Sequence, residues 1–254
     1  MKTVDFPREV TYNTLEPCKT RSCTCEEGNM DEKLYIVDYP KKSDYAEAAL
    51  IQVQYDYARF DACPQCGRRV SGAYWKKPRE VVLTKRRVPD FLYAYCDNVP
   101  FLVSDNFLTK YFDAGLKGIQ CAEEIESVRY QRTSKKDSAI PRYFHIELLR
   151  SQITVDHQKS IITYGKPDGN LFCPLCNQVP GTYDFIRSLS LKGAFEGYDI
   201  FQTYELGNTV FLSQRFVDFC NENKFTNLHF TPAEKHGRWA ASYFLDGIDA
   251  EKET

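Results

Sequence analysis

Apolar and polar positions alternate along the chain in two matching series. Eight segments have the alternation, or the β-branched and aromatic content, that predicts strands. They fall into two sets of four, at 33–39, 90–95, 100–104 and 117–123, and at 142–149, 199–205, 209–213 and 226–232. Apolar residues at helical spacing predict one helix over 105–115 and another over 214–224. The pattern therefore predicts an α+β fold of two similar strand-rich halves, each with one main helix.

The ends of both helices carry recognisable signals. Ser104 and Ser213 directly precede the two helical stretches, and a serine hydroxyl can accept hydrogen bonds from the free amides of a first turn. Gly115 suits the left-handed conformation in which many helices end. We expect the helices to begin after these serines.

Single residues recur at a nearly constant shift between the halves. Asp90 and Ser104 reappear 109 residues later as Asp199 and Ser213, and the pair of cysteines in CPQC reappears 110 residues later in CPLC. This recurrence predicts an internal duplication. The alternative is two unrelated stretches that share common strand and helix patterns.

The duplication suggests where the chain divides. We expect five segments: a polar N-terminal segment over 1–30, a first repeat over 31–129 with the CPQC turn, a linker over 130–140, a second repeat over 141–234 with the CPLC turn, and a C-terminal tail over 235–254.

Composition and charge limit the class of protein. The chain has 254 residues and a formal net charge of −2, so it lacks the basic surplus typical of nucleic-acid-binding proteins. Its first residues show no secretory signal, and no apolar run is long enough to span a membrane. We therefore expect a cytoplasmic protein with reduced thiols and no membrane association; the oligomeric state stays open.

The two CPxC turns carry the clearest candidate chemistry. Each Cys-x-x-Cys turn can offer two thiolates to one metal, and tetrahedral zinc needs four. Cys63, Cys66, Cys173 and Cys176 are therefore predicted to bind one structural zinc that joins the halves. Gly67 suits the positive φ often needed after such a turn.

Other uses of the cysteines stay open. One of Cys18, Cys23 or Cys25 could complete a metal site with one pair, or the turns could be metal-free and either buried or redox-active. A thioredoxin-like site is not favoured, because the residues after Cys66 do not resemble the start of a helix. For the three cysteines at apolar-patterned positions, Cys96, Cys121 and Cys220, we expect burial.

We find no recognisable catalytic motif. The chain lacks a Walker phosphate loop, an HExxH motif and a GxSxG motif, so we expect a protein that is not an enzyme. The one basic stretch, over 76–87, has interleaved apolar residues that predict a strand with one solvated face.

The CPxC turns and the apolar segments that follow them resemble the double-CXXCG motif family of bacterial proteins over residues 30–235. The motif cysteines correspond to the four named above and the motif glycine to Gly67, whereas Asn177 departs from the motif. The family is associated with immunity proteins of polymorphic toxin systems. The resemblance therefore implies a protein that binds and neutralises a cognate toxin. The alternatives are a zinc-dependent nucleic-acid-binding or regulatory module and an enzyme of unknown type.

Overall fold

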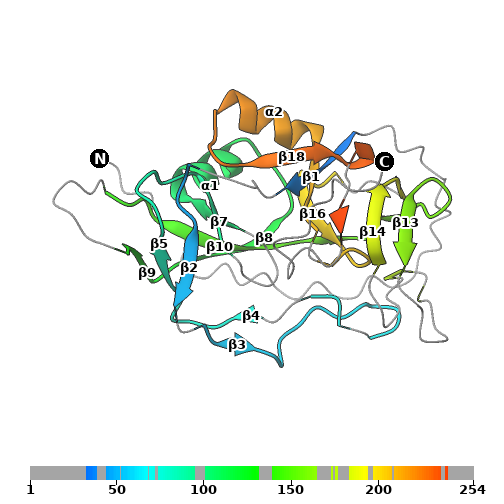
Figure 1. Ribbon diagram of the computed structural model, residues 1–254, viewed down its shortest axis with the longest axis horizontal. Coiled ribbons are helices and arrows are strands. Elements are labelled where there is room, and N and C mark those ends of the chain that lie inside the picture. The colour runs from blue at the N-terminus through cyan, green and yellow to red at the C-terminus, as the bar shows by residue number, and fades with distance from the viewer. Residues whose placement is uncertain are drawn as a thin grey trace, which may run out of the picture.

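A computed structural model of the protein describes residues 33–38, 44–51, 53–67, 69–71, 74–94, 101–131, 139–164, 173, 175–176, 183–193, 197–207, 209–235 and 238–239. Within these residues the fold is α+β, as predicted: short strands form six sheets, and two α-helices accompany them (Figure 1).

Two larger sheets dominate the structure. The four-stranded sheet has the order β6 (Phe91–Tyr93), β7 (Phe101–Ser104), β10 (Tyr143–Leu148) and β8 (Ile119–Glu124). The five-stranded sheet has the order β11 (Arg150–Ser151), β16 (Ile200–Thr203), β17 (Phe211–Ser213), β1 (Leu34–Asp38) and β18 (His229–Pro232). All eight predicted strands are therefore present.

The two large sheets exchange one strand each. β1, from the first half of the chain, lies between β17 and β18 of the second half. β10, from the second half, lies between β7 and β8 of the first half. Leu34 pairs with Ser213, and Tyr143 pairs with Ser104, so the two junctions share the same register at this end. Each large sheet therefore needs both halves of the chain, which the sequence pattern alone did not predict.

Four smaller sheets complete the described structure. β2 (Ala48–Ile51), β5 (Glu80–Leu83) and β9 (Ser127–Tyr130) form one, and β3 (Tyr55–Asp56) pairs with β4 (Tyr74–Trp75). β12 (Thr154–Val155) pairs with β15 (Leu191–Lys192), and β13 (Ile161–Tyr164), β14 (Tyr183–Ser188) and β19 (Arg238–Trp239) form the last. A 3-10 helix, η1, spans Ala233–Lys235.

Both helices begin where the sequence predicted. α1 spans Asp105–Asp113 and α2 spans Gln214–Glu222. The Ser104 hydroxyl accepts a hydrogen bond from the amide of Phe107 at 3.2 Å, and the Ser213 hydroxyl accepts one from Phe216 at 3.1 Å. Gly115 follows α1 with φ +63°, as expected for a left-handed helix end.

The largest core lies against the two helices. Their buried faces meet residues of both large sheets, and the rings of Phe107 and Phe216 lie with centroids 6.0 Å apart. Both rings are fully buried. Since β1 and β10 also contribute to this core, a single apolar interior spans both halves.

Two aspartates connect the halves by hydrogen bonds at their carboxylates. Asp90 accepts from the amide of Thr226 at 3.0 Å and from the hydroxyl of Ser104. Asp199 accepts from the amide of Lys117 at 2.8 Å and from the hydroxyl of Ser213. Each aspartate thus holds an N-cap serine of its own half and a backbone amide of the other half.

The prediction for the basic stretch was only partly correct. Its middle forms the strand β5, as predicted. However, Val81, Val82 and Leu83 are all buried, so β5 lacks the solvated face that the sequence predicted. Tyr130, at the start of the expected linker, is the last residue of β9. No helix among the described residues is long and apolar enough to cross a membrane.

Candidate metal centre

Four cysteine side chains from distant parts of the chain converge at one point. The Sγ atoms of Cys63 and Cys173 lie 3.8 Å apart, and those of Cys66 and Cys176 lie 3.6 Å apart. All four Sγ atoms lie within 4.8 Å of one another, and none of these cysteines is in a disulfide. The structure therefore brings together the four residues that the sequence singled out.

The first turn has the backbone of a metal-binding knuckle. The Gly67 amide donates to the carbonyl of Cys63 at 2.8 Å, and Gly67 adopts φ +72°. A short antiparallel bridge between Ala62 and Arg69 closes the loop behind the cysteines. The positive φ expected at Gly67 is thus observed, and it lets both thiols of the turn face the same side.

The first knuckle is fastened to the second half of the chain. Arg150 donates to the Asp61 carboxylate at 2.8 Å and to the carbonyls of Thr203 and Gly207 at 3.0 and 2.8 Å. A Cβ atom on Gly207 would lie 2.3 Å from the carbonyl oxygen of Val70, so only glycine permits this close approach. These contacts hold the knuckle where Cys173 and Cys176 can meet it.

The thiol geometry fits a tetrahedral metal. Four sulfurs at about 2.3 Å from a central zinc are about 3.8 Å apart, close to the two Sγ–Sγ distances above. Cys63, Cys173 and Cys176 are buried, whereas Cys66 is exposed. With four thiols present, the protein can supply every ligand of a closed tetrahedral site.

The surroundings of Cys173 favour its thiolate. Burial by itself would raise the pKa of this thiol. Hydrogen bonds from the backbone amides of Cys176 and Leu175 and from the thiols of Cys66 and Cys176 have a larger, opposite effect, and together they lower the pKa to about 7. A thiolate is the form that binds metal, so this environment suits a ligand.

The remaining cysteines and histidines do not join this cluster in the part of the chain described. Cys220 is buried in the main core, as expected, and Cys121 is only half-buried. His145 and His229 lie in strands β10 and β18, as predicted. Cys18, Cys23, Cys25 and Cys96 lie outside the described residues.

A cavity beside β4 was not anticipated as a site. It has a volume of about 180 Å³ and is lined by residues of β3 and β4, the segments next to them, and Glu123 of β8. Lys76, Lys77 and Arg79 belong to the basic stretch noted in the sequence. The basic stretch was therefore visible in the sequence. Glu123 and Asp56 come from other parts of the chain, and only the fold brings them to the same cavity.

Comparison with known protein families gives a match to the second half of the chain. Residues 122–235 match the sequence model of a protein family that is described as "Immunity protein family (Imm11)". The matched residues include Cys173 and Cys176. No curated protein matches the chain. Over residues 122–235 the chain is thus similar to an immunity protein family, and the resemblance to immunity-type proteins inferred from its motifs is confirmed.

Proposed function

We propose that this chain is an immunity protein that binds a cognate bacterial protein toxin in the cytoplasm and neutralises it. The observation that carries the proposal is the match of residues 122–235 to an immunity protein family. Neutralisation by binding needs a stable scaffold and a complementary surface, and it needs no catalytic group. The protein would therefore act by occupying its partner and not by turnover.

Zinc has a structural role in this proposal. Cys63, Cys66, Cys173 and Cys176 would each give one thiolate to the ion, and the geometry of their sulfurs supports this assignment. A catalytic zinc site keeps one position open for water or substrate, whereas four thiolates close the coordination sphere. The metal would join the CPQC turn of one half to the CPLC turn of the other.

An internal duplication would explain why the centre needs two distant turns. The repeats proposed are residues 31–129 and 141–234, joined by a linker over 130–140. Support comes from contacts that recur 109 residues apart: Phe91 pairs with Val103 in one large sheet, and Ile200 pairs with Leu212 in the other. The carboxylate contacts of Asp90 and Asp199 recur in the same way.

Co-expression with a candidate toxin, chosen from the proteins encoded beside this chain's gene, tests the function. We expect cells to survive only when this chain is present, and the two proteins to elute as one complex. A Cys173→Ser variant, folded at low temperature, should still protect, because the proposed metal acts through stability. Survival without a complex, or turnover of a small molecule by the purified chain, would contradict binding as the mechanism. Salt-dependent binding to DNA or RNA, with no toxin bound, would instead support the regulatory module.

A further inference from the structure

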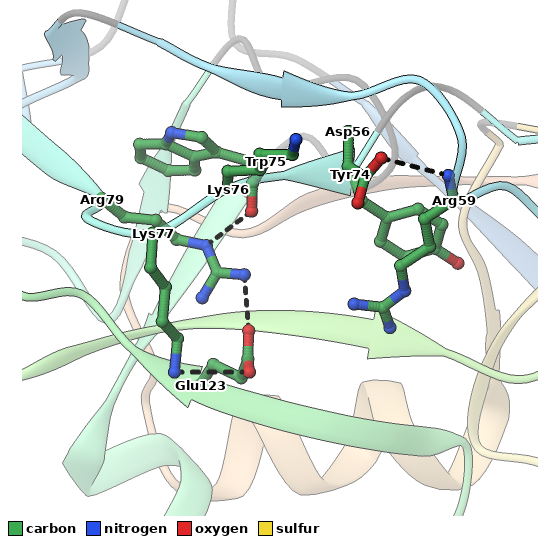
Figure 2. Close-up of a pocket in the computed structure, with 8 residues that line it drawn as sticks. All are labelled: Asp56, Arg59, Tyr74, Trp75, Lys76, Lys77, Arg79 and Glu123. Atoms are coloured by element: carbon green, nitrogen blue, oxygen red, sulfur yellow. Dashed lines mark hydrogen bonds and ion pairs between the residues drawn. The ribbon is translucent and has the colours of Figure 1, made fainter.

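The cavity beside β4 is rich in basic side chains. Arg59, Lys76, Lys77 and Arg79 line it, against two acidic residues, Asp56 and Glu123. Figure 2 shows Lys77 and Arg79 reaching the same carboxylate of Glu123 from β8, and the Arg59 side chain lying beside the ring of Tyr74. The chain as a whole is slightly acidic, so this local excess of positive charge stands out.

The acidic groups present do not use all of the cationic donors. The Glu123 carboxylate forms ion pairs with Arg79 Nη2 at 2.5 Å and with Lys77 Nζ at 3.4 Å. Arg79 is only 3% exposed, yet its Nη1 atom has no hydrogen-bond partner among the described residues. An unpaired buried donor costs free energy that a bound acceptor can recover. Lys76 is exposed, and its ammonium adds charge at the rim.

Arg59 lines the cavity and is also partly exposed to solvent. Its guanidinium makes two hydrogen bonds of 2.8 Å to the Glu147 carboxylate and lies 4.1 Å from the centre of the Tyr74 ring. About half of the Arg59 side chain remains accessible to solvent. Arg59 is therefore held in place by its own contacts while part of it stays available to a partner.

Exposed aromatic residues lie in the same short segment. Tyr57 is 69% exposed and Phe60 is 44% exposed, and they flank Arg59 in the chain. They are two of the four large apolar side chains exposed among the described residues. Aromatic residues and arginine dominate the energetic centres of protein interfaces.

We propose that this face, formed by Tyr57, Arg59, Phe60 and the cavity with Lys76 and Arg79, binds an acidic segment of a protein partner. A carboxylate of the partner would enter the cavity and face the basic side chains, while its apolar atoms would lie on Tyr57 and Phe60. The proposal rests on the proposed function, since it names the surface that meets the toxin. β3 and β4 lie on the side of the molecule opposite α1 and α2 (Figure 1), so this surface is separate from the helical core.

Binding of the candidate toxin domain used for co-expression, carrying a substitution that removes its toxicity, tests the surface. Isothermal titration calorimetry would compare the full-length chain with Tyr57→Ala and Lys76→Glu. Both residues are exposed, so we expect unchanged melting temperatures and a Kd raised at least about tenfold by each substitution. Phe112→Ala, an exposed aromatic on α1, and Lys192→Glu, an exposed lysine on β15, are the matched controls and should bind as the wild type does.

The outcomes separate the surface from the function. If the wild type binds the toxin domain and the Tyr57 and Lys76 variants bind equally well, the surface is wrong while the immunity function stands. If the wild type does not bind the toxin domain, the proposed function fails, and the surface assignment fails with it. A Lys76→Glu variant that loses affinity for single-stranded RNA but keeps its affinity for the toxin domain would also overturn the proposal.

Discussion

Phe107 and Phe216, each the third residue of its helix, lie with ring centroids 6.0 Å apart in the centre of the protein. They are 109 positions apart in the chain, the shift at which Asp90 and Asp199 also recur. Both rings are fully buried, so each helix start is held by packing as well as by its serine cap. The contact places two residues that are 109 positions apart against each other, and the cysteine pairs, 110 positions apart, meet in a similar way.

The aspartates beside these helix starts should contribute similarly to stability. Asp90→Ala or Asp199→Ala would leave a serine hydroxyl and a backbone amide of the other half without their acceptor. We expect each substitution to lower the free energy of unfolding by about 2–4 kcal/mol, measured by urea denaturation. Asp113→Ala, an exposed position at the end of α1, should change it by less than about 0.5 kcal/mol. An effect at only one aspartate would contradict their equivalence.

A metal at the four cysteines should be measurable directly. We expect about one zinc per chain in protein purified without a metal-affinity step, and much less in Cys173→Ser. Loss of a metal that binds only the folded state should also lower the melting temperature by about 10 °C. Elemental analysis and thermal unfolding test both points, with Cys121→Ser as the control that keeps its metal. A wild-type protein that is fully folded and metal-free would rule out the zinc assignment.

Gly118 should be far less tolerant of substitution than Gly115. Both have positive φ, but a Cβ on Gly118 would lie 1.7 Å from the carbonyl oxygen of Ile200, whereas nothing lies within 4 Å of one on Gly115. We expect Gly118→Ala to cost at least about 3 kcal/mol, because the β16 backbone must move. Gly115→Ala should cost only about 1–2 kcal/mol from its left-handed backbone. Equal costs in urea denaturation would show that the close approach is unimportant.

His145 should make stability depend on pH in a defined window. Burial, together with the charge of Arg79, lowers its pKa from 6.5 to about 4, so the unfolded chain binds a proton here at pH values where the folded protein does not. The part of the free energy of unfolding that depends on a neutral His145 is fully present above about pH 6.5, and it is lost as the pH falls toward 4. Its full size is about 3 kcal/mol, at about 1.4 kcal/mol per pKa unit.

The measurement compares unfolding free energies at pH 7 and pH 5 in the wild type and in His145→Gln. Glutamine does not titrate, so the variant should lose less stability than the wild type on acidification, even if it starts less stable. Identical pH dependence in the two proteins would refute the shifted pKa.

Local features of the structure were predictable from the sequence. The two helices, their serine caps, the left-handed Gly115 and all strands of the large sheets except β11 follow from residues within a few positions of one another. Periodicity and capping are short-range properties, so a linear pattern records them. The grouping of Cys63, Cys66, Cys173 and Cys176 was also predictable, because zinc requires four ligands and the chain repeats its CxxC turn.

The exchange of β1 and β10 between the large sheets was decided only by the tertiary structure. A strand's alternation records which face is buried, but it does not record which partner completes its hydrogen bonds. For the same reason β5 was expected to have a solvated face, although the fold covers both of its faces. The cavity beside β4 combines Arg59, Arg79 and Glu123 from three separate segments. Such long-range contacts are selected by the packing of the whole chain, because many partners satisfy the local pattern and few fill a common core.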